Sequence, residues 1–179
     1  MGAGILPVAL YRGVLYLLLG QERNNLWSDF GGGAHKRETP FQTAIREGTE
    51  ELNGFFGNEE ELEKEVSNNM ILSICYDKYN TYVYKTKYSK DLPIYFTNNN
   101  KFIESQASNI ISTKHNGLYE KKTINWINID NFNEEKYIKM LRPHYKEHIV
   151  CILKKKNFII NTIRTIEKMG GEKWREENK

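Results

Sequence analysis

The chain has 179 residues, of which 39% are hydrophobic and 27% are charged, and its formal net charge is +3. A chain of this length buries roughly 70% of its unfolded surface, so it needs no disulfide or metal staple to fold. The two cysteines, Cys75 and Cys151, have neither metal-site nor redox-site spacing. They argue against a disulfide scaffold and predict reduced thiols in a cytoplasmic setting.

The N-terminal part contains two apolar runs, residues 5–11 and 14–19, which Arg12-Gly13 separates. Neither run reaches the roughly 20 residues that a membrane helix needs, so we expect no membrane partner. Two buried strands that turn at Arg12-Gly13 are the better interpretation. Met1-Gly2 does not indicate myristoylation, because Leu6 stands where that motif requires Ser or Thr.

A helix is expected to begin at Pro40. Thr39 is a good N-cap, Pro40 suits the first helical position, and Gln42 at the third position completes a capping box. Asn53-Gly54 should end the helix, since both residues tolerate the left-handed backbone conformation. The expected packing face of this helix consists of Phe41, Ala44, Ile45 and Leu52.

Three carboxylates, Glu47, Glu50 and Glu51, lie at positions i, i+3 and i+4 near the end of this helix. This spacing places them on one face. Like charges there destabilise an isolated helix by a few tenths of a kcal/mol per pair, so a cation among them is expected. A hard divalent ion is the natural candidate, because it prefers oxygen ligands.

The remainder of the chain reads as further strands and helices around one core. Residues 59–64 form a charged insertion, either helix or loop, residues 71–87 read as strands, and residues 98–100 read as a polar loop. Two helices are expected at 134–141 and from Tyr145 onward. We therefore predict an α/β sandwich with a mixed sheet, as a single domain over residues 1–168 followed by a flexible tail at 169–179.

The acidic helix and the glycines before it resemble the signature of Nudix hydrolases. That signature is a glycine, five residues, a glutamate, seven residues, Arg-Glu, two residues, and Glu-Glu. The residues that match are Gly32, Glu38, Arg46, Glu47, Glu50 and Glu51. Gly48 departs from it where an apolar residue is usual, and Asn53 and Gly54 replace the closing glycine and the apolar residue after it. Six matching positions make the resemblance specific.

Two other segments resemble the same family. Residues 27–32 look like its tryptophan and Pro-Gly-Gly approach, with Phe30 in place of proline, and residues 123–130 look like its tryptophan-centred strand. The resemblance implies a Nudix-type α/β/α sandwich with a loop-helix-loop catalytic motif. It also implies Mg²⁺, with Mn²⁺ as a substitute, held by Glu47, Glu50, Glu51 and Gly32.

The resemblance further assigns roles in the attack of water on a pyrophosphate. Arg46 is expected to hold Glu47 or Glu38 in place, and the loop Gly31, Gly32 and Gly33 should approach metal and phosphate. The catalytic residues implied are Glu50, Glu51, Arg46 and Glu120. The base is open, since Glu104 and His115 are alternatives to Glu120. His144 and His148 have metal-ligand spacing, but without a third ligand they are expected at a helix surface.

The substrate is not specified by these residues. The first hypothesis is a small nucleoside diphosphate linked to another group. The second is capped mRNA or a diphosphoinositol polyphosphate, and the third, from another class, is a non-catalytic sensor. RNA is considered because the second half of the chain carries many basic residues, beside a group of tyrosines that can stack on bases. These residues are Lys85, Lys87, Lys90, Lys114, Lys121, Lys122, Lys136, Lys139, Arg142, Lys146, Lys154, Lys155 and Lys156. The apolar C-terminal helix also leaves a homo-oligomer open.

Overall fold

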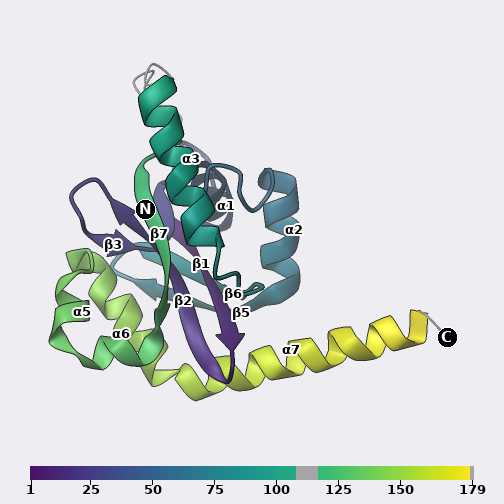
Figure 1. Ribbon diagram of the computed structural model, residues 1–179. Coiled ribbons are helices and arrows are strands. Elements are labelled where there is room, and N and C mark those ends of the chain that lie inside the picture. Colours follow the sequence, from purple (N-terminus) through teal and green to yellow (C-terminus); the bar gives the residue numbers. More distant parts are fainter. Residues whose placement is uncertain (108–116, 178–179) are drawn as a thin grey trace.

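The computed structural model describes residues 1–107 and 117–177. It begins with an antiparallel hairpin of β1 (Gly2–Tyr11) and β2 (Val14–Glu22), in which Tyr11 pairs with Val14. Arg12 (φ 50°) and Gly13 (φ 79°) form the two-residue turn. Positive φ at both positions matches the twist of the paired strands. The hairpin predicted from the two apolar runs is confirmed (Figure 1).

A mixed seven-stranded sheet is built on this hairpin. Its order is β3-β2-β1-β6-β5, with β4 also paired to β1 and β7 also paired to β2. β1 and β6 run parallel, whereas the other pairs are antiparallel. The remaining strands are β3 (Trp27–Ser28), β4 (Phe30–Gly33), β5 (Met70–Tyr76), β6 (Tyr79–Lys85) and β7 (Lys121–Asn128). The strands expected within residues 71–87 and 123–130 are therefore present.

Helices pack on both faces of this sheet. They are α1 (Pro40–Glu51), α2 (Glu59–Asn69), α3 (Leu92–Gln106), α5 (Glu135–Lys139), α6 (Lys146–Lys154) and α7 (Lys156–Glu177), with short 3-10 helices η1 (Ile129–Asn133) and η2 (Pro143–Tyr145). Within residues 1–107 and 117–177, none of the helices has the length and apolar character needed to cross a bilayer.

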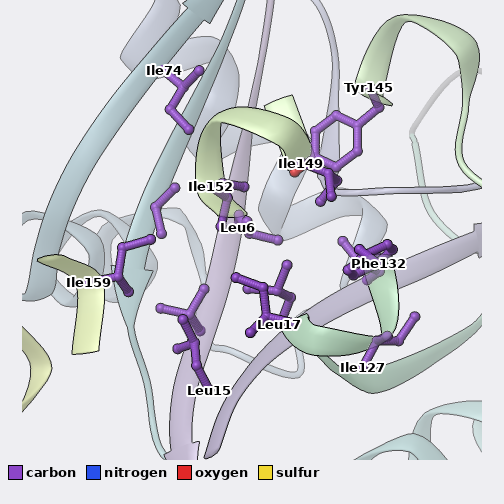
Figure 2. Close-up of a cluster of buried hydrophobic side chains, with 14 of the residues drawn as sticks. Leu6, Leu15, Leu17, Ile74, Ile127, Phe132, Tyr145, Ile149, Ile152 and Ile159 are labelled. Atoms are coloured by element: carbon purple, nitrogen blue, oxygen red, sulfur yellow. The ribbon is translucent and has the colours of Figure 1, made fainter. Parts of the chain in front are cut away.

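Two apolar clusters show how the layers are formed. The neighbouring residues Ile5 and Leu6 of β1 point to opposite faces, as the period of a strand requires. Ile5 joins a cluster with α1, α2 and α3, and Leu6 joins a second cluster with α6 and α7. Figure 2 shows Leu6, Tyr145 and Ile149 in the second cluster. The expected α/β/α sandwich is confirmed.

The start of α1 is fixed by the predicted capping box. The Thr39 side chain accepts a hydrogen bond from the Gln42 amide at 3.2 Å, and the Gln42 side chain accepts one from the Thr39 amide at 3.0 Å. Thr39→Ala is expected to lower the free energy of unfolding by about 1 kcal/mol, because an amide of the first turn loses its acceptor. Urea unfolding measures this loss. Thr39→Ser keeps the hydroxyl, so an equal loss in that control would contradict the capping explanation.

The polar loop expected at residues 98–100 is wrong, because these residues lie inside α3. The three asparagines are poor helix formers, but tertiary contacts outweigh propensity. Phe96 packs in the core, and the buried Asn100 side chain donates to the carbonyl of Lys121 at 2.7 Å.

The first helix of the C-terminal region is shorter than the expected 134–141, since α5 covers only Glu135–Lys139. α7 continues past residue 168 to Glu177 and projects away from the sheet (Figure 1). The domain boundary at 168 and the mobility of residues 169–179 stay predictions. Cys75 and Cys151 are free thiols, as expected.

Candidate active site

The three carboxylates of α1 do not share one environment. Glu47 and Glu50 keep part of their side chains exposed, 15% and 25% respectively, whereas Glu51 is buried. The Glu51 Oε2 atom accepts a hydrogen bond from the Gly31 amide at 2.7 Å. The helix face is therefore divided at the edge of β4, with Glu51 turned toward the sheet.

Arg46 lies among the remaining acidic groups. Its Nε lies 2.8 Å from Glu38, and its Nη1 lies 3.0 Å from Glu47 and 3.2 Å from Glu50. Its Nη2 also donates to the carbonyl of Gly33 at 3.0 Å. The sequence left open whether Arg46 contacts Glu38 or Glu47, and the structure places it on both. One guanidinium therefore links the glycine loop to the acidic helix.

Glu38 is firmly held in its ionised form. The hydrogen bond from Arg46 lowers the pKa of Glu38 from 4.5 to about 2, and the His35 amide and Thr43 hydroxyl act in the same direction. The unfolded chain therefore binds more protons than the native protein between these two pH values. Glu38 stabilises the fold above pH 4.5, and this contribution is lost as the pH falls toward 2.

Replacing Glu38 with Gln is expected to flatten the acid side of the stability profile. Between pH 4.5 and about 2, the free energy of unfolding should fall less steeply in Glu38→Gln than in the parent protein. Urea unfolding at a series of pH values measures both slopes. Parallel profiles would show that the Arg46 contact is not retained in solution.

A cavity of about 220 Å³ lies over the exposed side of this cluster, lined by His35, Arg46, Glu47, Glu50, Gly117 and Glu120. Burial raises the pKa of Glu47, Arg46 opposes this, and the charge of Glu120 adds to it. Burial likewise raises the pKa of Glu50, with Glu47 contributing in the same direction. Three carboxylates thus line one cavity with Arg46 as a neighbouring cation, and their combined negative charge favours an additional cation there.

The other candidates for a proton acceptor lie elsewhere. Glu104 lies on α3, where it pairs with Arg23 at 3.3 Å, and it does not line the cavity. His115 is outside the described residues. Among the candidates that the structure describes, Glu120 therefore has the most favourable position.

His148 corrects the expectation of a helix-surface histidine. It is fully buried and stacks on Tyr145, with 5.4 Å between ring centroids and an interplanar angle of 8°. Burial lowers the pKa of His148 to about 4. Its neighbour His144 faces Tyr79 at 5.8 Å. Of the two histidines, only His148 lies in the core, whereas His144 is exposed, as expected.

The glycine loop is shaped by close contacts. A Cβ on Gly32 would lie 2.6 Å from the carboxylate carbon of Glu47, so only glycine lets this carboxylate lie against the backbone. Gly48 also has a packing reason, because a side chain there would overlap Ile5 of β1. The departure from the family pattern at residue 48 therefore fits the contact of α1 with the sheet.

Asn53 has a function that the sequence did not reveal. Its backbone adopts the expected left-handed conformation (φ 51°). Its side chain also donates to Asn100 at 2.9 Å and accepts from the Tyr119 amide at 2.8 Å. These bonds connect the end of α1 to α3 and to the segment that carries Glu120. The one sequence feature that could have indicated these contacts is the asparagine itself, which stands where the family pattern has its closing glycine.

Lys121 was missed as a site residue, since it read as one of many surface lysines. It is fully buried at the start of β7, and its Nζ lies 3.2 Å from Glu51 Oε1. The same atom lies 3.0 Å from Ser28 Oγ and 3.5 Å from Glu22 Oε1. Burial raises the pKa of Glu51, which the Lys121 ammonium and the Gly31 amide oppose.

The carboxylates at the cavity suit a hard divalent ion whose other ligands are water molecules and substrate phosphates. Within residues 1–107 and 117–177, no three His, Cys, Asp or Glu side chains converge closely enough to form a complete metal cage. Mg²⁺ commonly uses only one or two carboxylates, together with waters and substrate phosphates. Glu47 and Glu50 at the cavity match that requirement.

Solved structures share this architecture. A C. elegans Ap4A hydrolase in a binary complex matches with a TM-score of 0.53 and 17% identity, over 90% of this chain and 99% of that one. A bifunctional NMN adenylyltransferase/ADP ribose pyrophosphatase from Francisella tularensis matches with a TM-score of 0.54 and 19% identity. That match covers 86% of this chain and 41% of the bifunctional one. No family model and no curated protein matches the sequence.

At these identities the comparisons show the fold. The chain has the Nudix fold, so the resemblance inferred from the glycine loop and acidic helix is confirmed at that level.

Proposed function

We propose that the protein is a Mg²⁺-dependent hydrolase that cleaves a pyrophosphate bond in a nucleoside diphosphate linked to another group. The observation that carries the proposal is the cavity at which Glu47, Glu50 and Glu120 meet beside Arg46. Nucleophilic attack on a diphosphate requires neutralisation of its negative charge and a group that accepts a proton from water. Carboxylates that hold a cation and one further carboxylate meet both requirements.

The residues divide these tasks by position. Glu47 and Glu50 would hold the ion, with the backbone carbonyl of Gly32 as a further oxygen ligand. A bound Mg²⁺ neutralises phosphate charge and lowers the pKa of a coordinated water. Arg46 keeps Glu47 and Glu50 in place through contacts of 3.0 and 3.2 Å. Glu120 would accept the proton as the oxygen of water bonds to phosphorus and the bridging oxygen leaves.

The named activities of the similar structures agree with a nucleotide substrate. One is an Ap4A hydrolase, and the other includes an ADP ribose pyrophosphatase complexed with AMP and a Mn ion. Both names describe nucleoside phosphates joined to a second group. This shared chemistry supports a small nucleotide as the first substrate class to test.

Part of the charge of the basic second half is neutralised by acidic neighbours, so this region supports RNA less strongly than the sequence alone suggested. Several lysines of the basic second half pair with acidic neighbours: Lys136 with Glu134 at 2.7 Å, Lys139 with Glu135 at 2.8 Å, and Lys156 with Asp130. These lysines are therefore partly neutralised. A long polyanion would need a continuous cationic track, for which exposed and unpaired lysines are the usual means.

The test is a substrate panel with Mg²⁺ in ¹⁸O-labelled water, with products identified by mass. The panel contains dinucleotides, nucleotide sugars, capped RNA and diphosphoinositol phosphates. We expect cleavage of a dinucleotide or nucleotide sugar, with ¹⁸O in one phosphate product. Turnover of capped RNA or diphosphoinositol phosphate alone would replace the proposed substrate class. No turnover across the panel would favour a non-catalytic sensor.

A further inference from the structure

The side chain of Lys121 lies in a buried space beside strand β2. Lys121 is fully buried, and Gly20 of β2 lies beside its aliphatic part. A Cβ on Gly20 would lie 2.8 Å from Cδ and 3.0 Å from Cγ of Lys121. The absence of a side chain at residue 20 therefore gives Lys121 the room to reach inward.

The ammonium group at the end of this side chain is surrounded by oxygen atoms. Glu51, Ser28 and Glu22 lie 3.2, 3.0 and 3.5 Å from Nζ. An ammonium has three N–H donors, so three partners use its full capacity. Burial of a charge without such partners is strongly unfavourable, so the ammonium stays with these oxygen atoms.

Both oxygens of Glu51 are already engaged. Oε2 accepts from the Gly31 amide at 2.7 Å, and Oε1 faces Lys121. Glu51 is 4% exposed and does not line the cavity that Glu47 and Glu50 line. A divalent ion at Glu51 would lie beside the ammonium, whose charge repels it, at a position that the cavity does not reach.

We propose that Lys121 is a built-in cation that takes the place of a divalent ion at Glu51. Glu51 then positions the glycine loop through Gly31 and does not bind the metal. Glu47 and Glu50 are left as the carboxylates of α1 that hold it. The inference rests on the proposed function, since it concerns the metal of that same site, and it revises the role of Glu51 that the family resemblance implies.

The test measures Mn²⁺ binding to the whole chain without nucleotide, by electron paramagnetic resonance of the free ion. Glu50→Gln should weaken binding by about tenfold or more. Glu51→Gln should bind Mn²⁺ as the parent protein does, because the replaced carboxylate is not a ligand. Lys121→Met should bind one additional Mn²⁺ per chain, because it frees Glu51 as an unpaired carboxylate.

A double variant guards against misfolding. Lys121→Met alone leaves buried acids without their cation, whereas Lys121→Met with Glu51→Gln removes both charges and should lose the additional Mn²⁺. If Lys121→Met does not fold, Glu51→Gln decides alone. Equal losses of Mn²⁺ affinity in Glu51→Gln and Glu50→Gln would overturn the inference only. Absence of Mn²⁺ binding by the parent protein would overturn the proposed function as well.

Discussion

Glu50→Gln is expected to lower kcat for the cleaved nucleotide by at least about 100-fold, because a carboxylate that holds the divalent ion is lost. Glutamine has nearly the same size, so its amide oxygen can still accept the hydrogen bond from Arg46 that Glu50 accepts at 3.2 Å. The fold should therefore be retained. Initial rates at saturating Mg²⁺ and a thermal unfolding curve measure the two effects separately.

The matched control for this prediction is Glu60→Gln. Glu60 is exposed on α2 and does not line the cavity. Its replacement by Gln removes the same charge as Glu50→Gln does. Its kcat should equal that of the parent protein. A similar fall in both variants would indicate that overall charge controls the rate, and full activity in Glu50→Gln would contradict the proposed metal site.

Gly31→Ala is expected to lower the free energy of unfolding by about 3 kcal/mol, at the upper end of what an overpacked core position costs. Gly31 of β4 pairs with Gly4 of β1. A Cβ on Gly31 would overlap the Gly4 backbone, the carbonyl of Ala3 and the hydroxyl of Tyr79. Two of these neighbours are backbone atoms within a paired ladder, so they cannot move aside cheaply. Denaturant unfolding measures the loss.

Gly33→Ala is the matched control within the same strand. No atom lies within 4 Å of a Cβ placed there, so its effect should stay within about 0.5 kcal/mol. If both variants are equally unstable, the loss arises from a general need for glycine in β4. If neither is unstable, the ladder tolerates displacement at Gly4 and Gly31.

The elements that depend on local chemistry were predictable. The turn at Arg12-Gly13 and the capping box at Thr39 use residue types whose preferences operate over a few residues. The helical conformation of residues 98–100 within α3 was not, because the Asn100 side chain is held by the carbonyl of Lys121, which lies far along the chain on β7. Local pattern cannot report a partner that only the tertiary fold supplies.

The candidate site was predictable in its residues and less so in its arrangement. Helical spacing placed Glu47, Glu50 and Glu51 on one face, but the edge of β4 divides that face between cavity and core. The burial of Lys121 could not be predicted, since nothing in the sequence distinguishes a buried lysine from an exposed one. Its burial depends on Gly20, one glycine among 13.

The contacts of Lys121 also bear on the order in which the chain folds. The residue is separated by 93 positions from Ser28 and by 99 from Glu22. Contacts at such separation require the closure of a long loop, whose entropic cost precedes any gain from the contact. The ammonium can therefore meet Glu22 and Ser28 only as β7 pairs with β2. Helix α1 is favoured by local signals such as its capping box. The buried ion pair between Lys121 and Glu51 requires that β7 has joined the sheet.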